Sequence, residues 1–345
     1  MTKVCTRCIY DDATPGISFD ENGVCNYCKI HDEMEAQYPT GEAGWKKLEE
    51  MAAQIKKAGK GKKYDCIIGV SGGCDSSYLL HLSKKLGLRP LAVHFDNTWN
   101  SKIAVENIEI VLKKLDIDLW TYVMDNEEFN DLAYSMLKAS IPEIDALTDI
   151  ALTTTAYMAA DKYKIKYILN GHSFRTEGIT PSNWFYFDGK YIDSIHKQFG
   201  RRKVDKFPNL TLGKWIPWLI KDIKRLGPLY YIDYKKEDVK KFLIKEYGWK
   251  WYGGHHLENR YCAYNHYLLN TKFKRDLRYV EYSALIRCGQ MTREQGIEEV
   301  NIPQEYPIRI ISRQWGQSPC GSCTGIQWIQ VLRNNSLACC INQGC

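Results

Sequence analysis

Residues 71–77 read SGGCDSS and combine small, flexible residues with hydroxyl groups that could hold a phosphate. Gly72 and Gly73 let backbone N–H groups turn toward an anion, because neither residue carries a Cβ atom. Asp75 suits a helix N-cap or a group beside Mg²⁺. Hydroxyl donors are added by Ser71, Ser76 and Ser77. The segment therefore predicts a phosphate-binding loop at the start of a helix.

The predicted loop lacks the lysine of the common nucleotide-binding pattern G-x-x-x-x-G-K-S/T. That lysine reaches the terminal phosphates, so its absence argues against cleavage of a γ-phosphate. A serine- and glycine-rich nest without lysine suits a compact leaving anion such as pyrophosphate. The alternative is a tight strand–helix turn of small residues, which the specific residue pattern disfavours.

Two C-x-x-C pairs near the N-terminus have the spacing of a four-cysteine zinc site. The ligands would be Cys5, Cys8, Cys25 and Cys28. Four thiolates leave no open coordination position, which predicts a structural Zn²⁺ rather than a catalytic one. A segment this short has too little apolar content to fold alone, so the metal would supply stability. The alternative is two unrelated cysteine pairs.

Strands and helices alternate around the predicted loop. Continuous apolar runs predict buried strands at residues 64–70, 89–95, 117–124 and 166–171. Helical patterns follow them at residues 75–87, 101–116, 127–139 and 142–164. This alternation predicts an α/β fold with a doubly wound parallel sheet, in which the loop joins the first strand to the first helix.

Two further strand ends carry candidate ligand-binding residues. Asp96 follows the second predicted strand, and Gly171 and His172 follow the fourth. Ligands of open α/β sheets bind at the carboxyl ends of the strands, so these residues could share a site with the loop. Taken alone, Asp96 could equally be a turn aspartate and His172 a surface histidine.

The composition predicts a cytoplasmic chain with a real core. Hydrophobic residues make up 44% of the 345 residues, and the net charge is +6. The N-terminus lacks the apolar core of a signal peptide, and no run of about 18 apolar residues is present, so no membrane partner is expected. Lysines such as Lys235 and Lys236 are spread as on solvated helix faces, and without a basic stripe we expect no nucleic-acid partner.

The loop at residues 71–77 resembles the PP-loop of the ATP pyrophosphatase superfamily, which cleaves ATP between the α and β phosphates to adenylate a substrate oxygen. The resemblance implies an adenine nucleotide α-hydrolase-like fold that uses ATP and Mg²⁺. It also implies that Asp96 contacts the adenosine and that Gly171 and His172 line the ATP site. Asp75 and Ser76 are then the catalytic candidates within the loop.

Three later segments resemble the N-acetyl sugar amidotransferases of bacterial surface-polysaccharide and nonulosonic-acid pathways. These segments are residues 170–200, 249–273 and 278–295, and the resemblance runs from about Cys5 to about residue 303. The family turns an acetamido group into an acetamidino group, which implies that the adenylated oxygen belongs to an N-acetyl sugar. Ammonia would then displace AMP, and the product would serve O-antigen, lipopolysaccharide or flagellar glycan synthesis.

The source of ammonia is predicted to be a separate protein. A glutaminase needs a nucleophilic cysteine, either N-terminal or paired with a histidine. Residue 2 is Thr2, Cys5 is assigned to zinc, and no Cys–His glutaminase signature stands out. The family resemblance implies two partners, a glutaminase subunit and a cyclase-like barrel subunit.

Residues near the sugar are predicted from their position. Arg175 and Glu177 follow the fourth strand and could face the activated amide, as further catalytic candidates. Substrate-binding candidates lie beside a flexible Gly-Gly pair and are His255, His256, Glu258 and Arg260. Ordinary surface salt bridges are the alternative. Aromatic residues that could stack on a sugar or base, although such residues are more often core, are Trp249, Trp251 and Tyr252.

The predicted domain organisation has five parts. They are a zinc-binding module (1–30), a helical linker (31–63), a PP-loop ATP-binding domain (64–200), a helical substrate or partner region (201–303) and a cysteine-rich tail (304–345). Helices in the fourth part are predicted at residues 235–247, 260–270, 274–288 and 292–299. The resemblance fades in the tail, whose composition suggests a frameshifted or disordered end. A second metal site is the alternative there, formed by Cys320, Cys323, Cys339, Cys340 and Cys345.

Two other functions remain open at this point. A tRNA-thiolating enzyme would also combine a PP-loop with cysteine motifs, but the missing basic stripe disfavours it. A non-catalytic PP-loop scaffold would need no intact loop, and the complete pattern from Ser71 to Ser77 disfavours that reading.

Overall fold

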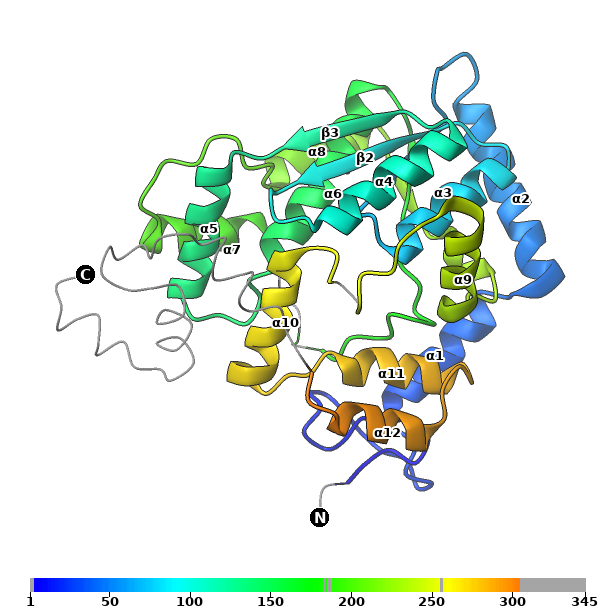
Figure 1. Cartoon of the computed structure of the whole chain (residues 1–345), viewed down its shortest axis with the longest axis vertical. Coiled ribbons are helices and arrows are strands. Elements are labelled where there is room, and N and C mark those ends of the chain that lie inside the picture. The colour runs from blue at the N-terminus through cyan, green and yellow to red at the C-terminus, as the bar shows by residue number, and fades with distance from the viewer. Residues whose placement is uncertain (1–2, 183, 185, 187, 255–256, 305–345) are drawn as a thin grey trace.

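Five parallel strands form one central sheet in the computed structural model, which describes residues 3–304 except 183, 185, 187, 255 and 256 (Figure 1). The strand order is β3-β2-β1-β4-β5. The strands are β1 (Cys66–Gly69), β2 (Pro90–Asp96), β3 (Leu119–Val123), β4 (Tyr167–Leu169) and β5 (Lys224–Leu226). The strand order therefore reverses between β1 and β4, because the chain adds β2 and β3 on one side of β1 and later adds β4 and β5 on the other.

The central strand β1 is buried on both faces. Ile67 is paired in register with Leu91 of β2 and Ile168 of β4. Ile67 contributes to a core cluster on one face, whereas the next residue, Ile68, contributes to the cluster on the other. Successive side chains of a strand point to opposite faces, so a continuous apolar run is what a sheet covered on both sides requires.

Helices cover both faces of the sheet, which confirms the predicted α/β doubly wound architecture. One face packs against α3 (Cys74–Lys85), α4 (Lys102–Leu115) and α9 (Lys236–Tyr247). The other packs against α6 (Ala146–Lys162) and α8 (Leu212–Ile220). A separate apolar cluster joins α5 (Asn126–Lys138), α7 (Gly189–Phe199) and α10 (Arg260–Phe273).

The N-terminal segment and the last described helices lie together, away from the sheet (Figure 1). The segment leads into α1 (Asn26–Gln37) and α2 (Gly41–Ala58). The last helices are α11 (Arg278–Arg287) and α12 (Arg293–Asn301). Val280 of α11 packs into the same cluster as Tyr10 and Tyr27, so the two ends of the described chain share one small core.

The four predicted strands and eight predicted helices are all present, within a few residues at each end. The sheet gains a strand beyond residue 200 that was not predicted, because β5 is a three-residue edge strand with exposed lysine and arginine. The helix α7, the apolar helix α8 with its internal Pro217, and the 3₁₀ turn η1 (Pro228–Tyr231) were also not predicted. The cysteines of the tail, from Cys320 onward, lie outside the described residues.

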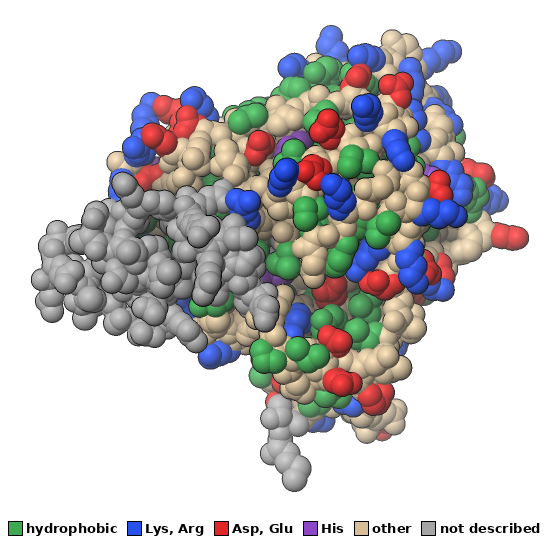
Figure 2. All heavy atoms as spheres, viewed as in Figure 1, with side chains coloured by type: hydrophobic (Ala, Val, Ile, Leu, Met, Phe, Trp, Pro, Cys, Tyr) green, Lys and Arg blue, Asp and Glu red, His purple; other side chains and the backbone are tan. Residues whose placement is uncertain are grey.

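Charges of both signs are interspersed on the face drawn in Figure 2, with apolar side chains between them. Lys and Arg do not gather there into a single stripe. Within residues 3–304 as described, no helix is both long enough and apolar enough to cross a lipid bilayer.

A glycine in α2 permits a close approach that can be tested. A Cβ atom on Gly44 would lie 2.2 Å from the carbonyl oxygen of Tyr231 and 2.4 Å from that of Pro39. We expect Gly44→Ala to lower the free energy of unfolding by about 1–3 kcal/mol, because neither backbone oxygen can move freely. Urea unfolding followed by circular dichroism measures the change.

The matched control is Gly213→Ala in α8, where no atom lies within 4 Å of the added methyl group. This variant should stay within about 0.5 kcal/mol of the parent. Equal midpoints for the two variants would show that α2 does not contact η1 in this way.

Candidate functional site

The loop at residues 71–77 follows β1, at the point between β1 and β4 where the strand order of the sheet reverses. Gly72 has a φ of 81°, and a Cβ atom there would lie 2.2 Å from the carbonyl oxygen of Ala104 in α4. The carbonyl of Gly72 accepts hydrogen bonds from Trp249 Nε1 at 3.0 Å and Asn107 Nδ2 at 3.2 Å. Trp249 is thus a buried anchor of the loop rather than an exposed stacking platform.

The hydroxyl groups of the loop hold its shape. Gly73 N donates to Ser71 Oγ at 3.2 Å, and Ser76 Oγ donates to the carbonyl of Gly73 at 3.3 Å. Ser77 is buried in the first turn of α3. The N-cap residue Gly73 has no side chain with which to cap α3. Backbone N–H groups at the start of a helix can bind an anion.

Glu258 lies at this loop, whereas the sequence predicted it for the sugar. Ser71 Oγ donates to Glu258 Oε1 at 3.4 Å. The carbonyl of Glu258 accepts from Ser101 N at 2.8 Å, which ties this segment to the start of α4. A carboxylate beside a phosphate loop can bind Mg²⁺. Arg260 begins α10 and is half-buried, and the predicted His255 and His256 lie outside the described residues.

The end of β4 meets the loop. A Cβ atom on Gly171 would lie 3.4 Å from the backbone carbon of Asp75 and from the nitrogen of Ser76. His172 Nε2 lies 3.5 Å from Glu177 Oε2, and its Nδ1 lies 2.9 Å from the Tyr230 hydroxyl. The structure therefore brings Gly171, His172 and Glu177 to the same carboxyl edge as the loop.

Asp96 closes a turn at the end of β2. Its Oδ1 accepts from Thr98 N at 2.8 Å and from Asn100 Nδ2 at 3.2 Å. Asp96 therefore lies at the predicted sheet edge, where it also shapes the connection into α4.

A pocket of about 330 Å³ opens beside His172 at the ends of β4 and β5. Its volume is at the lower end of ordinary small-molecule sites. Aromatic rings and one guanidinium line the pocket, together with His172: these residues are Tyr38, Tyr230, Tyr231 and Arg225. Such a lining suits a ring compound that carries negative charge.

Arg175 does not face this pocket with free donors. Its Nε and Nη2 donate to the two carboxylate oxygens of Glu35, both at 2.7 Å, and the guanidinium also donates to the carbonyls of Tyr38 and Tyr230. The side chain is buried. This geometry favours a structural role, in which Arg175 fixes the segment after β4 to α1, over the predicted contact with an activated amide.

Two residues beside Asp75 were not predicted. The Tyr234 hydroxyl donates to Asp75 Oδ1 at 2.5 Å, and burial raises the pKa of this phenol well above its usual value, with the Asp75 charge adding to the shift. Lys236 Nζ lies 3.7 Å from Asp75 Oδ2. The sequence placed Lys236 on a solvated helix face, and this was wrong, because its exposed fraction is 5%. No local sequence motif could predict either contact, because Tyr234 and Lys236 are about 160 positions from Asp75 in the chain.

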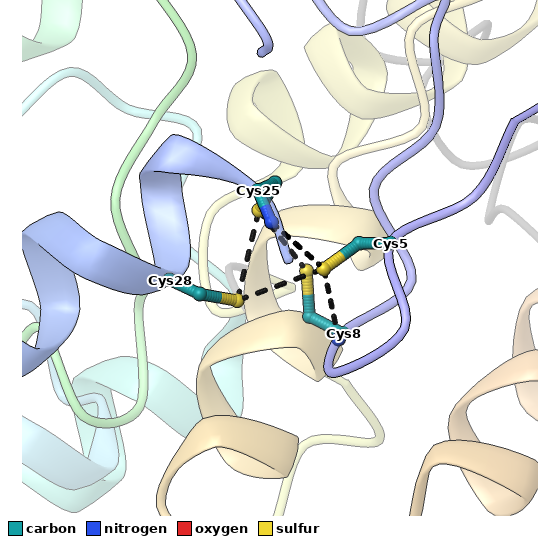
Figure 3. Close-up of side chains that lie close together, drawn as sticks. All are labelled: Cys5, Cys8, Cys25 and Cys28. Atoms are coloured by element: carbon teal, nitrogen blue, oxygen red, sulfur yellow. Dashed lines mark hydrogen bonds between the residues drawn. The ribbon is translucent and has the colours of Figure 1, made fainter. Parts of the chain in front are cut away.

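The four predicted zinc ligands converge, fully buried, in one cluster (Figure 3). Their Sγ atoms are 3.9 Å apart for Cys5 and Cys28, 3.7 Å for Cys8 and Cys25, and 3.6 Å for Cys25 and Cys28. Zn–S bonds of about 2.3 Å in a tetrahedron place sulfur atoms roughly 3.8 Å apart. The donor set therefore fits a single Zn²⁺, which would join the two C-x-x-C turns.

A buried arginine contacts two sulfur atoms of this cluster. Arg287 of α11 donates from Nε to Cys28 Sγ and from Nη2 to Cys8 Sγ, both at 3.3 Å. Arg293 Nε donates to the carbonyls of Cys5 and Cys8. A zinc ion with four thiolates carries a net double negative charge, so a buried guanidinium is a fitting counter-charge.

Comparisons with known proteins give a family match to residues 231–313 and a relative that matches about half of the chain. Residues 231–313 match the family described as "LPS biosynthesis protein WbpG-like, C-terminal domain". An uncharacterized protein of Methanocaldococcus jannaschii is 31% identical over 170 residues, which cover 49% of this chain and 58% of that protein. The chain thus matches little more than half the length of this relative.

Solved structures give weaker matches. The U34-tRNA thiolase NcsA of Methanococcus maripaludis, solved with its 4Fe–4S cluster, has 12% identity and a TM-score of 0.36 over 94% of this chain and 96% of its own. The NH3-dependent NAD synthetase of Campylobacter jejuni has 13% identity and a TM-score of 0.35 over 76% and 98%. With TM-scores below 0.5, these likenesses carry no functional conclusion.

Removal of one cysteine ligand should release the metal. We expect Cys25→Ser to reduce zinc from about one ion per chain to nearly none, because three thiolates hold the ion far less tightly. Plasma mass spectrometry of purified protein measures the zinc content, and thermal unfolding should show a lower midpoint. Cys66→Ala, a buried cysteine of β1 outside the cluster, is the control and should keep its zinc. Full zinc content in Cys25→Ser would contradict the assignment.

The ion pair between Glu35 and Arg175 should appear in a double-mutant cycle. Arg175→Met should destabilise the fold by about 1–3 kcal/mol, because it leaves the carbonyls of Tyr38 and Tyr230 without this donor and removes the ion pair with the half-exposed Glu35. Combined with Glu35→Gln, the coupling should be about 1–3 kcal/mol. The exposed pair Lys47–Glu50 serves as comparison and should couple by less than about 0.5 kcal/mol. Additive effects at Arg175 and Glu35 would refute the link.

Proposed function

We propose that the protein is an ATP-dependent amidotransferase that converts the acetamido group of an N-acetyl sugar into an acetamidino group. The observation that carries the proposal is the lysine-free loop at residues 71–77. This loop leads into α3 and lies where the strand order of the parallel sheet reverses. The family match of residues 231–313 supports a role in lipopolysaccharide biosynthesis. The resemblance of residues 170–200 and 249–295 to N-acetyl sugar amidotransferases supports the choice of substrate.

The first step in this proposal activates the amide. The acetamido oxygen attacks the α-phosphorus of ATP, the bond from that phosphorus to the bridging oxygen breaks, and pyrophosphate leaves. The loop amides, the Ser76 hydroxyl and the N-terminus of α3 would stabilise the charge that accumulates on the departing pyrophosphate. Mg²⁺, when bound, would neutralise phosphate charge, and Glu258 and Asp75 offer oxygen ligands for it.

The second step replaces oxygen by nitrogen. Ammonia attacks the activated carbon, the carbon–oxygen bond breaks, and AMP departs with the former amide oxygen. Glu177 and His172 lie at the loop's edge of the sheet, where they could accept the proton that the nitrogen loses. We propose that a glutaminase subunit and a cyclase-like barrel subunit deliver the ammonia.

The pocket beside His172 is proposed as part of the sugar site. Its tyrosine rings could pack against a sugar or base, and Arg225 could pair with a carboxylate or phosphate of the substrate. The substrate would be a nucleotide-linked N-acetyl sugar or a nonulosonate, whose negative charge matches this guanidinium.

Isotope labelling tests the reaction directly. The protein is incubated with ATP, Mg²⁺, ammonium chloride and a panel of N-acetyl sugars labelled with ¹⁸O in the acetamido group. Mass spectrometry should find the label in AMP and a sugar product in which NH replaces the amide oxygen. Formation of ADP and phosphate in place of AMP and pyrophosphate would refute the proposal, and co-purified tRNA that gains sulfur would favour the thiolating alternative.

Loop substitutions provide a second test. Ser76→Ala should lower AMP formation by roughly 100-fold, because in the proposed reaction the Ser76 hydroxyl turns from the Gly73 carbonyl to donate to the departing pyrophosphate. Asp75→Asn should also reduce it, and both variants should keep their zinc. Ser83→Ala is the matched control in the same helix, because its hydroxyl donates to the carbonyl of Leu80. AMP formation by Ser76→Ala at the parent rate would contradict the role of the loop.

A further inference from the structure

Lys236 is a buried ammonium group without a close hydrogen-bond partner. It is the first residue of α9, its exposed fraction is 5%, and its Nζ atom makes no hydrogen bond within the described part of the chain. The nearest carboxylate oxygens are 3.7 Å away on Asp75 and 3.8 Å away on Glu281. An ammonium carries three N–H donors, and burying it with none of them bonded is unfavourable. The N–H donors of Lys236 are therefore available to an anionic ligand.

The position of this ammonium is set by the phosphate loop. Asp75, its neighbour, lies in the first turn of α3 and directly precedes Ser76. Tyr234, two residues before Lys236, donates to the other oxygen of the same carboxylate. Lys236 thus lies beside the N-terminus of α3, where the helix dipole and the loop amides already favour negative charge.

The backbone around Lys236 is held in place by a side chain. Gln290 accepts a hydrogen bond from Lys236 N at 3.4 Å and donates from Nε2 to the carbonyl of Tyr234 at 3.0 Å. Gln290 lies three residues beyond the end of α11, whose last residue, Arg287, contacts the cysteine cluster. The lysine is therefore presented to the loop by a braced segment, as a binding group requires.

The carboxylates around Lys236 also favour a positive charge at this position. Asp75 and Glu281 flank Lys236, and Glu177 acts on it from the end of β4. Burial lowers the pKa of Lys236, but these carboxylates outweigh it and the net shift is upward, so the group stays charged at neutral pH. A multiply charged phosphate could not approach three carboxylates without a positive group among them.

We propose that Lys236 contacts the pyrophosphate part of ATP and supplies the cation that the loop at residues 71–77 lacks. The proposal rests on the proposed function for the identity of the anion. On ATP binding, the ammonium exchanges its two long contacts with carboxylates for charge-assisted hydrogen bonds to phosphate oxygens. The segment that the family match covers, residues 231–313, would then contribute Lys236 to the ATP site.

Calorimetric binding of inorganic pyrophosphate with Mg²⁺ tests this assignment on the full-length chain. We expect Lys236→Met to weaken pyrophosphate binding by at least about tenfold, as for the loss of a charged hydrogen bond. Binding of adenosine, measured in parallel, should stay within about threefold, because the substitution removes no contact to the nucleoside. Equal pyrophosphate affinity, or an equal loss for adenosine, would overturn the proposal.

Lys240→Met is the matched control, because it removes the same charge one turn further along α9. Lys240 Nζ pairs with Glu237 at 2.6 Å and lies 3.8 Å above the Trp251 ring. The pyrophosphate affinity of the Lys240→Met variant should stay within about threefold of that of the parent protein. A loss as large as that of Lys236→Met would show that general charge rather than contact is responsible, and would overturn the proposal.

Glu281→Gln provides an independent test if Lys236→Met does not fold. Removing this carboxylate takes away one competitor for the ammonium, so pyrophosphate should bind several-fold more tightly. Unchanged or weaker binding would contradict the assignment.

Failure of this proposal differs from failure of the proposed function. If the parent protein binds pyrophosphate through Lys236 but never forms AMP from any N-acetyl sugar, the reaction is wrong and Lys236 stands. If AMP forms but Lys236→Met binds pyrophosphate normally, only the role of Lys236 falls. A parent that does not bind pyrophosphate refutes the role of Lys236 outright.

Discussion

The bidentate ion pair between Glu35 and Arg175 joins the cysteine-cluster region to the carboxyl edge of the sheet. Glu35 belongs to α1, which begins at the cysteine cluster, and Arg175 belongs to the segment that leaves β4. The same segment receives a hydrogen bond from Tyr10 at Ile179, and Gly178 packs against the backbone of α11. The cysteine cluster therefore helps to position the end of β4, and with it Gly171, His172 and Glu177, although the cluster lies outside the sheet.

This arrangement gives a structural reason for a small four-cysteine module at the N-terminal end of an α/β protein. A segment of about thirty residues cannot bury enough apolar surface to hold a fixed orientation. Four thiolates around one ion would give it a rigid centre, and Arg287 and Arg293 attach that centre to the last described helices. A rigid cysteine centre would, through the contact of α1 with Arg175, also restrict motion at the carboxyl edge of the sheet.

The sequence was most informative where one local pattern determines structure. Apolar runs predicted β1 to β4, the turn pattern predicted the loop at residues 71–77, and cysteine spacing predicted the buried cluster. Prediction failed for β5, a short exposed edge strand, and for the burial of Lys236. A lysine at a helix start looks the same in sequence whether its side chain faces water or a distant aspartate. Tertiary packing, which the local sequence does not show, determines its partner. Arg175 shows the same limit, since its partner Glu35 is 140 residues away.

The contacts of the C-terminal segment bear on how such a protein could evolve. Tyr234 contacts Asp75, which follows the Gly-Gly turn after β1, and Arg287 contacts the cysteine cluster. The segment that contains both residues, 231–313, therefore contacts two separate centres of the remaining chain. A segment with such contacts is not a cassette that recombination can move between unrelated scaffolds. Exchange of this region between homologues would succeed only when the loop and the cysteine module travel with it, so the three are expected to be inherited as one unit.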